Sequence, residues 1–394
     1  MVKDSYKYLI LGGGISGAFA SYAIRRYDKR GRVAIVSSET HIPYDRVPLS
    51  KEFVRWERPF SELFFRKESF YRQKRIELIL GHKAISIDRK NKTVKLDDRR
   101  ELTYSKLLLA TGGKPRKLHV ANSDLEGIYY LRTIDDSVAI RQRIHESKNA
   151  VVVGGGFIGC EVASSLTQKG LQTTIVEVMP HILGKAIDEK TSGWIKEYHE
   201  AKGTKIYTNT KVVGFEGEDG RVKGVRLDNG KTLAADMVVV GVGIELNVEL
   251  ASSAGLSVNN GVQVSDKLQS QDADIYVAGD IANFYSPLLQ RQMRVEHYDV
   301  AEKHGTIAGS NMAGQDLSYD EPPYFFSDQY DLSINAFGDL IHHTEIISKE
   351  AMSKDGFIEY YIEGKKVVGI LSVNSDWDDI EEAKAKIGRD REEI

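Results

Sequence analysis

The chain has 394 residues, of which 41% are hydrophobic and 28% are charged, and its formal net charge at pH 7 is -3. This length exceeds one ordinary hydrophobic core and predicts two to three domains of a globular protein. The small negative charge argues against nucleic acid or an anionic membrane as the main partner, and no apolar run is long enough for integral membrane contact.

The first predicted unit is a strand, a glycine turn and a helix at the start of the chain. A strand at Tyr8–Leu11 leads into a G-x-G-x-x-G turn, a helix follows, and a second strand spans Val33–Val36. The spaced glycines are Gly12, Gly14 and Gly17. Such a turn favours a dinucleotide, because its backbone can approach the phosphates at the positive end of the helix.

The polar residues after this second strand are the next candidates. Either Glu39 accepts a hydrogen bond from a ribose, or the hydroxyl of a preceding serine takes its place. A loop stiffened by Pro43 and Pro48 then presents Arg46 and Lys51, which suits contacts with phosphate or flavin. Ordinary solvated charges are the alternative for these two cations.

A basic segment with aromatic neighbours comes next. Its cations are Arg66, Lys67, Arg72, Lys74 and Arg75, and its aromatic residues are Phe64, Phe65, Phe70 and Tyr71. A solvated helix face over buried aromatic side chains is the simpler interpretation, and a docking patch for an acidic redox partner is the functional one. A hairpin with strands Ala84–Ile87 and Thr93–Leu96 follows, and then a strand and glycine turn at Leu107–Gly113.

The central stretch of the chain repeats the first unit more clearly. A strand at Val151–Val153 runs into the same glycine spacing, here Gly154, Gly156 and Gly159. The helix that follows carries Ile158, Val162 and Leu166 on one face and ends at Gly170. A strand at Thr173–Val176 leads to Glu177.

Glu177 stands where a dinucleotide site requires an acid. A carboxylate there can accept a hydrogen bond from a ribose 2′-hydroxyl and would repel a 2′-phosphate, which predicts NAD(H) rather than NADP(H). A purely structural strand-to-helix turn is the alternative for a lone glycine motif. Strand, helix and acid agree here, and this consistency favours the nucleotide site.

The rest of the chain repeats the architecture and then returns to the first domain. Hairpin strands at Val212–Phe215 and Val222–Leu227 precede a strand at Met237–Val240 with a glycine turn. A later strand ends in Gly279 and Asp280, and an acid at that end of a strand lies where ligands of such sheets bind. The last predicted elements are a helix that starts at Arg294–Tyr298 and runs toward Met312, a boundary at Glu321–Pro323 and a terminal helix at Trp377–Ile387.

Together these motifs resemble the FAD-dependent pyridine nucleotide-disulfide oxidoreductase superfamily, over essentially the whole chain. The segments PYDRVPLSK, ATGGKPR, LRTIDD, GGGFIGCE and FFSDQYD are similar to its ferredoxin reductase branch. The segments RVEHYDVAEKHGTIAGSNMAG and GKKVVGI are similar to apoptosis-inducing factor.

The resemblance implies an α/β fold with two Rossmann-like FAD/NAD(P)-binding domains and a small α+β C-terminal domain. The FAD-binding domain would be discontinuous, at 1–116 and 244–320, and the NAD-binding domain would span 117–243. Residues 321–394 would form a C-terminal interface domain of the dimerisation type, which allows a homodimer.

The same resemblance implies two sets of cofactor-binding residues. The FAD set is Gly12, Gly14, Gly17, Glu39, Arg46, Lys51, Ala84, Arg132, Gly279, Asp280, Glu296, His297 and Phe326. The NAD(H) set is Gly154, Gly156, Phe157, Ile158, Gly159, Glu177 and Gly243.

Four residues are implied to take part in catalysis. Lys51 and Glu161 would form a buried ion pair that positions and tunes the flavin. Phe157 would cover the nicotinamide side of the flavin, and His297 would border the isoalloxazine. Core packing is the alternative for Phe157, and a hydrogen-bonded structural role is the alternative for His297.

Three departures from the family pattern bear on the reaction. The loop from Pro43 to Lys51 lacks the cysteines of the disulfide reductases, and Cys160 is expected to be a buried packing residue. Phe326 stands where the branch often has tryptophan, and Glu245–Asn247 replaces the common x-Pro-Asn. The last two departures concern the acceptor side more than the cofactors.

The leading hypothesis is therefore a flavoprotein reductase, an NADH oxidoreductase. Hydride would pass from NADH to FAD, and electrons would leave without a protein thiol to a ferredoxin- or rubredoxin-like protein, a quinone or oxygen. The alternative is an NADH-responsive redox signalling protein with slow turnover, as the likeness to apoptosis-inducing factor allows.

The cysteine and histidine residues bear on disulfides and metal sites. Cys160 is the only cysteine, which excludes an intramolecular disulfide and a thiolate zinc site, and the ten histidines show no ligand spacing, so no metal site is predicted. The N-terminus enters a strand directly and offers no signal peptide, so we expect a cytoplasmic protein.

Overall fold

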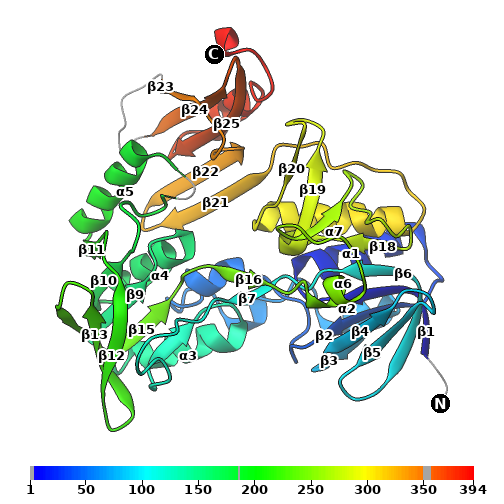
Figure 1. The fold of residues 1–394 in the computed structure, drawn as a ribbon, viewed down its shortest axis with the longest axis horizontal. Coiled ribbons are helices and arrows are strands. Elements are labelled where there is room, and N and C mark those ends of the chain that lie inside the picture. Colours follow the sequence, from blue (N-terminus) through cyan, green and yellow to red (C-terminus); the bar gives the residue numbers. More distant parts are fainter. Residues whose placement is uncertain (1–3, 185–186, 349–355) are drawn as a thin grey trace. The chain divides into compact units, whose positions relative to one another are not determined.

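The structure, a computed structural model, describes residues 4–184, 187–348 and 356–394. The chain packs into two compact units, each assembled from segments that are far apart in the sequence (Figure 1). The first unit contains Met1–Asp45, Ser61–Lys114 and Leu246–Phe325. The second contains Arg46–Phe60, Pro115–Glu245 and Phe326–Ile394. The predicted boundaries of three domains stay a prediction.

A seven-stranded sheet forms the centre of the first unit. Its strands are β1 (Asp4–Leu11), β2 (Val33–Ser37), β3 (Ile76–Leu80), β4 (Ala84–Asp88), β5 (Thr93–Leu96), β6 (Glu101–Leu109) and β18 (Ile275–Val277). The order is β3-β2-β1-β6-β5-β4, and β18 pairs with β6. The pairs β1–β2, β1–β6, β2–β3 and β6–β18 are parallel, and the predicted hairpin β4–β5 is antiparallel. Leu9, Ile10 and Leu11 are buried in β1, as expected of a parallel strand covered on both faces.

Four helices and a small sheet complete the first unit. They are α1 (Ile15–Tyr27), α2 (Glu68–Gln73), α6 (Glu249–Ser253), α7 (Tyr298–Met312), β17 (Val262–Val264), β19 (Ala282–Ser286) and β20 (Arg291–Met293). In the basic segment, Tyr71 is buried and the guanidinium of Arg66 lies 5.7 Å from the ring centre of Phe70. These contacts favour the simpler interpretation of that segment, in which cations lie over buried aromatic rings.

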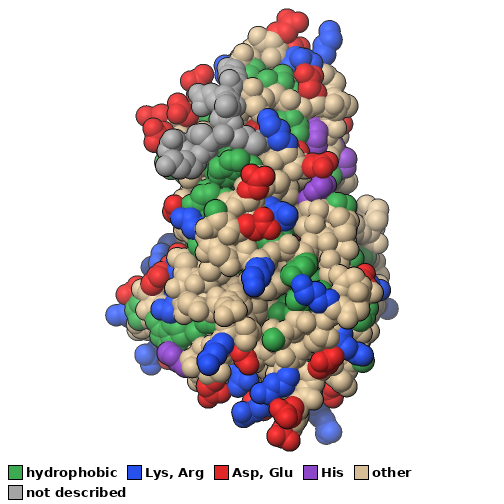
Figure 2. All heavy atoms as spheres, turned by 90° about the vertical axis from the view of Figure 1, so that its left-hand side faces the viewer, with side chains coloured by type: hydrophobic (Ala, Val, Ile, Leu, Met, Phe, Trp, Pro, Cys, Tyr) green, Lys and Arg blue, Asp and Glu red, His purple; other side chains and the backbone are tan. Residues whose placement is uncertain are grey.

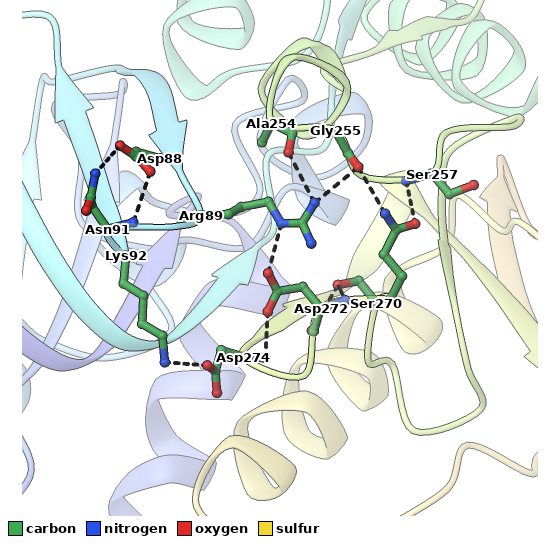
Figure 3. Close-up of polar contacts among 11 residues, drawn as sticks. Asp88, Arg89, Asn91, Lys92, Ala254, Gly255, Ser257, Ser270, Asp272 and Asp274 are labelled. Atoms are coloured by element: carbon green, nitrogen blue, oxygen red, sulfur yellow. Dashed lines mark hydrogen bonds and ion pairs between the residues drawn. The ribbon is translucent and has the colours of Figure 1, made fainter.

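A polar network ties the returning part of the chain to the β4–β5 hairpin (Figure 3). Nε of Arg89 donates to Asp272 at 2.8 Å, and Nη1 donates to the carbonyl oxygen of Gly255 at 3.2 Å. Lys92, in the turn of the hairpin, forms an ion pair with Asp274. The two ion pairs join residues that are 183 and 182 positions apart. The discontinuous first unit is thus held by side-chain contacts as well as by the pairing of β18 with β6.

A five-stranded parallel sheet forms the centre of the second unit. Its order is β11-β10-β9-β15-β8, from strands β8 (Ile128–Tyr130), β9 (Asn149–Val153), β10 (Gln172–Val176), β11 (Lys205–Tyr207) and β15 (Met237–Val240). The helices are α3 (Ile134–Ile144), α4 (Phe157–Gln168) and α5 (Glu189–Ala201). A three-stranded sheet contains β12 (Val212–Glu218), β13 (Arg221–Leu227) and β14 (Thr232–Ala234), and β7 (Gly113–Pro115) pairs with β16 (Ile244–Leu246).

A five-stranded sheet and a helix form the C-terminal part. The sheet has the order β21-β22-β25-β24-β23, from β21 (Tyr324–Gln329), β22 (Leu332–Gly338), β23 (Glu345–Ser348), β24 (Phe357–Glu363) and β25 (Lys366–Val373). The terminal helix α8 (Trp377–Lys384) is shorter than predicted. The amide of Ile387 bonds to the carbonyl oxygen of Lys384, so the chain after Lys384 continues as turns rather than as an α-helix.

The predicted α/β class is confirmed, since each unit has a sheet with parallel strands and a glycine turn between a strand and the helix that follows it. No helix in the described ranges combines the length and the apolar character that crossing a bilayer requires. Figure 2 shows the face on which α5 and β13 lie, with Lys and Arg side chains interspersed among Asp and Glu. This mixture agrees with the small net charge of the chain.

Candidate functional site

The first glycine turn, between β1 and α1, places a different demand on each of its spaced glycines. Gly12 has a φ of +128°, and a Cβ there would lie 2.0 Å from the carbonyl oxygen of Ala110. A Cβ on Gly17 would lie 2.0 Å from the carbonyl oxygen of Gly12. A Cβ on Gly14 would meet nothing within 4 Å. The first and third glycines are therefore required by the fold, and the second borders open space.

The second turn, between β9 and α4, repeats this division. Gly154 has a φ of +104°, and a Cβ there would lie 2.4 Å from the carbonyl oxygen of Gly241. A Cβ on Gly159 would lie 2.0 Å from the carbonyl oxygen of Gly154, whereas Gly156 has nothing within 4 Å. Each turn leaves the space beside its second glycine free, where a phosphate must approach the backbone.

Both helices begin without a side-chain cap. The N-cap residues of α1 and α4 are Gly14 and Gly156, and neither cap contributes a side-chain hydrogen bond. Backbone N–H groups in the first turn of each helix are therefore not satisfied by a cap and can donate to an anion. The open space and the uncapped helix ends fit the pyrophosphate of a dinucleotide at each turn.

The acid after the second turn is held firmly in place. Oε2 of Glu177 accepts a hydrogen bond from the amide of Gly155 at 2.5 Å, and Oε1 accepts one from the amide of Met179 at 2.8 Å. Each carboxylate oxygen keeps a further lone pair for a ribose hydroxyl. The next two side chains, Val178 and Met179, are exposed and apolar, so neither offers a cation to a 2′-phosphate.

The acid after the first turn has a local partner as well. The hydroxyl of Tyr44 donates to Oε2 of Glu39 at 2.5 Å, and the amide of Glu39 donates to the hydroxyl oxygen of Ser37 at 3.2 Å. The Ser37 side chain is buried and already serves this backbone contact. These contacts favour Glu39 over Ser37 as the group that meets a ribose.

The first turn of α4 is more exposed than the turns that follow it. Val162 and Leu166 are fully buried, whereas Ile158 is 49% exposed. Ile158 lies only two residues after the open Gly156, ahead of the part of α4 that packs on the sheet. Phe157 is partly buried. The accessible first turn suits a ligand better than core packing does.

Lys51 and Glu161 form the predicted buried pair within the second unit. The ammonium nitrogen of Lys51 lies 3.9 Å from Oε1 of Glu161, and both side chains are buried. It lies closer, at 3.0 Å, to Oδ2 of Asp328, and it is 4.9 Å from the ring centre of Phe326. Lys51 thus has two further neighbours, Asp328 and Phe326, both on β21. The predicted ion pair with Glu161 did not imply either of them.

Glu161 is enclosed by hydrogen-bond donors. The Ser50 hydroxyl donates to Oε2 at 2.5 Å, and the Ser327 hydroxyl donates to Oε1 at 2.7 Å. Burial raises the pKa of Glu161 above its ordinary value, and Lys51 and the two hydroxyls act in the opposite direction. The protonation state of Glu161 therefore depends on its few partners.

His297 is the N-cap residue of α7 and packs on Phe325, with ring centres 4.6 Å apart. Its Nδ1 is buried and has no hydrogen-bond partner among the described residues. Burial lowers the pKa of His297 to about 4, with Asp280 opposing the shift. An imidazole that is neutral and has an unsatisfied nitrogen fits a site that a polar cofactor completes.

The remaining predicted FAD residues lie in both units. In the first unit, Arg294 links two of them, since its Nη1 donates to Glu296 at 2.5 Å and to the carbonyl oxygen of Asp280 at 3.2 Å. In the second unit, Nη1 of Arg46 donates to the carbonyl oxygen of Arg132 at 2.6 Å. The first unit also contains Gly12, Gly14, Gly17, Glu39, Ala84, Gly279 and His297, and the second contains Lys51 and Phe326.

Ala84, Gly279 and Gly243 have specific local settings. Ala84 is buried at the start of β4. Gly279 has a φ of +77°, and a Cβ there would lie 2.6 Å from Oγ of Ser16. Gly243 has a φ of +94° and open space around a Cβ, as Gly156 has.

Two features of the structure were not predicted from the sequence. The first is the contact between Asp328 and Lys51. Asp328 belongs to the segment FFSDQYD, and its likeness to the ferredoxin reductase branch was the available sign that this residue matters. The close packing of α1 and α7 depends on Gly305 and Gly309, where a Cβ would lie 2.3 Å from the carbonyl oxygens of Ser16 and Ala20. The four-residue spacing of these glycines was the signal for that contact.

Two smaller expectations concern cysteine and metal. Cys160 is buried in α4, as predicted, and burial raises the pKa of its thiol far above the ordinary value. His82, Asp97 and Asp98 place one potential ligand atom each within 4.8 Å of the others, and the two acids are exposed. Exposed groups of this kind are common without a metal, and the expected absence of a metal site stays a prediction.

Comparisons with known proteins give the family. Residues 6–305 match the model of the pyridine nucleotide-disulphide oxidoreductases, and residues 324–392 match that of the reductase C-terminal domain. Rubredoxin-NAD(+) reductase of Ectopseudomonas oleovorans is 33% identical over 339 residues, which cover 86% of this chain and 88% of that protein.

Two solved structures share the fold. The ferredoxin reductase for the CYP199A2 system from Rhodopseudomonas palustris has 34% identity and a TM-score of 0.91, over 96% of this chain and 93% of that one. The covalent putidaredoxin reductase–putidaredoxin complex has a chain with 30% identity and a TM-score of 0.94, over 99% and 94%. The chain therefore belongs to the pyridine nucleotide-disulphide oxidoreductase family, as an FAD- and NAD(H)-dependent reductase.

Proposed function

We propose that this reductase takes reducing equivalents from NADH and passes them to a ferredoxin- or rubredoxin-like protein. The observation that carries the proposal is the pair of glycine turns, each with open space beside its second glycine and an uncapped helix behind it. Bound FAD supplies the chemistry that joins a two-electron donor to a one-electron acceptor. The chain has only one cysteine, so the route we propose uses no protein disulfide.

FAD would be held first by the glycine turn between β1 and α1. Gly12, Gly14 and Gly17 would admit its phosphates, and Glu39 would accept from its ribose. The remaining members of the implied FAD set are Arg46, Lys51, Ala84, Arg132, Gly279, Asp280, Glu296, His297 and Phe326. The unsatisfied Nδ1 of His297 supports this assignment.

NADH would be held by the second turn. Gly154, Gly156 and Gly159 would admit its phosphates, Phe157, Ile158 and Gly243 would line its path, and Glu177 would accept from the ribose. The fixed carboxylate of Glu177 and the apolar side chains after it support a preference for NADH over NADPH.

Four residues would act on the reacting groups. Lys51 would orient the flavin through its ammonium, and Glu161 would hold the Lys51 side chain in position. Phe157 would cover the nicotinamide side of the flavin and exclude water. His297 would border the flavin in its neutral form at pH 7, in agreement with its lowered pKa.

The acceptor is proposed from the names of the relatives. One acts as a rubredoxin-NAD(+) reductase, and a solved structural relative is a reductase in covalent complex with putidaredoxin. Phe326 and Glu245–Asn247 depart from the family pattern on the acceptor side, so the partner of this chain is expected to differ in detail. Reduction of ferredoxins, rubredoxins, a quinone and oxygen by the NADH-reduced protein would rank these acceptors.

Three further proposals concern organisation. We propose the domain division 1–116 with 244–320, 117–243 and 321–394, which limited proteolysis can test. A homodimer through the C-terminal domain can be tested by light scattering.

We also propose a cytoplasmic location. The single cysteine of the chain, Cys160, is buried and suits a reducing compartment. Cell fractionation can check the location.

Rapid mixing separates the reductase from the slow signalling alternative. The FAD-loaded protein is reduced by NADH and then mixed with a candidate acceptor. Fast reoxidation by a ferredoxin- or rubredoxin-like protein supports the proposal. Reduction followed by slow reoxidation with every acceptor would favour the NADH-responsive signalling protein.

A further inference from the structure

The carboxylate of Glu161 is the end of a chain of buried hydrogen bonds. Its Oε1 accepts from the hydroxyl of Ser327 at 2.7 Å. A hydroxyl has one proton, so Ser327 donates to Glu161 only if another group does not claim that proton. The neighbours of the Ser327 oxygen therefore decide whether Glu161 keeps this donor.

The neighbour of Ser327 is an amide that donates to it. Nε2 of Gln329 lies 3.1 Å from Oγ of Ser327, and both residues are fully buried on β21. Because the amide nitrogen is a donor only, Ser327 accepts from Gln329 and its own proton stays directed at Glu161. Ser327 cannot turn away without leaving a buried donor unsatisfied, which is unfavourable.

The other end of Gln329 is fixed by a histidine. Oε1 of Gln329 lies 2.8 Å from Nε2 of His199, which is fully buried on α5. An amide oxygen can only accept, so Nε2 of His199 carries a proton and donates. Nδ1 of His199 is buried and has no partner among the described residues, so a second proton there would have no acceptor in that part of the chain. Burial lowers the pKa of His199, which keeps the imidazole neutral at pH 7.

These contacts form one directed series of donors, from His199 to Gln329 to Ser327 to Glu161. We propose that His199, Gln329 and Ser327 are positioning residues that hold Glu161 ionised and aimed at Lys51, and thereby set the pH range of flavin reduction by NADH. The link from Glu161 to the flavin rests on the proposed function. The series itself consists only of residues of the second unit.

The charged and titratable groups around both ends are few. Lys51, Asp328 and Cys160 interact electrostatically with Glu161, and the Ser50 hydroxyl donates to it. The ring of Tyr330 packs on His199 at 5.1 Å. Lys51 and Ser50 favour the ionised form of Glu161, and Asp328 disfavours it. The donor series acts with Lys51 and Ser50 to favour the ionised form of Glu161. Loss of the series therefore favours the protonated form.

The test compares Ser327→Ala and Gln329→Met with a matched control. Ser372→Ala is the control, because Ser372 is a buried serine of the same C-terminal sheet whose hydroxyl has no partner among the described residues. The first readout is the infrared absorption of the protonated carboxyl against pH in the oxidised, FAD-loaded protein. Glu161→Gln identifies the band that belongs to Glu161. The second readout is the pH profile of flavin reduction by NADH.

Both readouts should move together. In Ser327→Ala, the midpoint of Glu161 protonation and the acid limb of flavin reduction should shift upward by about one pH unit, as expected when a charged acceptor loses one hydrogen bond. In Gln329→Met, Glu161 keeps the Ser327 hydroxyl but that hydroxyl loses the donor that fixes its orientation, so the shift should have the same direction and be smaller. The control should keep the original midpoint. His199→Phe should behave as Gln329→Met does, and His199→Gln, which keeps a donor, should restore part of the shift.

An unchanged infrared midpoint in folded Ser327→Ala and Gln329→Met would overturn the inference. If Ser327→Ala does not fold, Gln329→Met tests the same series one step further from Glu161. A shifted midpoint in a protein that NADH does not reduce would contradict the proposed function and leave the donor series standing.

Discussion

The ammonium of Lys51 lies 3.0 Å from the carboxylate of Asp328, closer than the 3.9 Å that separates it from Glu161. The side chain of Asp328 is 46% exposed, whereas those of Lys51 and Glu161 are buried. Water screens the nearer pair and not the farther one. Lys51 is therefore coupled to Glu161 more strongly than the two distances alone suggest.

Replacement of Lys51 should show this coupling. Lys51→Ala leaves Glu161 as a buried acid without its cation, which costs about 3–5 kcal/mol of stability in comparable cases. We expect a lower unfolding temperature, an altered flavin spectrum and slower reduction by NADH. Asp328→Asn is the control and should have the smaller effect on all three. A Lys51→Ala protein that matches the wild type in spectrum and reduction rate would refute the assignment.

The two kinds of glycine in the second turn should respond differently to alanine. At Gly156 a Cβ meets no atom within 4 Å, so Gly156→Ala should fold normally and bind NADH more weakly by filling the space for phosphate. At Gly159 a Cβ would lie 2.0 Å from a backbone oxygen, so Gly159→Ala should lower the unfolding temperature. Calorimetry and the KM for NADH separate the two effects. Equal losses of stability at both positions would contradict this division.

Cofactor preference should depend on the charge of Glu177. The wild type should have a much lower kcat/KM with NADPH than with NADH, and Glu177→Ala should narrow the gap by about tenfold, a change of about 1.4 kcal/mol. Glu177→Gln keeps one acceptor oxygen for the amides of Gly155 or Met179 and removes the charge. This variant therefore separates the effect of the Glu177 charge on cofactor preference from the effect of its hydrogen bonds to the loop. Equal use of both cofactors by the wild type would reject the assignment.

The network of Figure 3 should contribute to the stability of the first unit. Arg89→Ala removes a hydrogen bond to Asp272 and two to carbonyl oxygens, which predicts a loss of about 1–3 kcal/mol. Arg221→Ala removes an exposed pair with Glu126 and should cost about 0–1 kcal/mol. Denaturant unfolding gives both values. A loss at Arg89 no larger than at Arg221 would show that the network is not stabilising.

A buried histidine should make the protein less stable in acid. His304 packs between Phe284 and Tyr319, and burial lowers its pKa from 6.5 to about 3. The unfolded chain binds this proton first, so stability should fall as the pH drops from 6.5 toward 3, by up to about 1.4 kcal/mol per pH unit. His304→Phe should flatten this slope, and His82→Gln, at a partly exposed site, should not. Parallel slopes in wild type and His304→Phe would exclude this origin.

The sequence was sufficient for features that depend on local pattern. The two glycine turns and the hairpin strands follow from spacing and alternation, and the structure has them. In the structure Thr133 also caps α3 in a capping box with Asp136, which is a signal between residues three positions apart. Local signals sufficed because each of these elements is determined by residues close together in the chain.

Contacts between distant segments could not be predicted in the same way. Ser327 meets Glu161 across 166 positions, and His199 meets Gln329 across 130. The exposure of Ile158 depends on where α4 meets the sheet, and periodicity alone does not show that point. Even a correctly expected pair, Lys51 with Glu161, gave no sign of the nearer Asp328.

An anaerobic titration of the purified protein with NADH, followed by absorbance, shows most directly whether this chain binds FAD and passes electrons from NADH to an acceptor. We expect a yellow protein whose flavin absorbance is bleached by NADH and recovers when a ferredoxin- or rubredoxin-like acceptor is added. A colourless protein that cannot be reconstituted with FAD, or a bound flavin that NADH does not reduce, would contradict it.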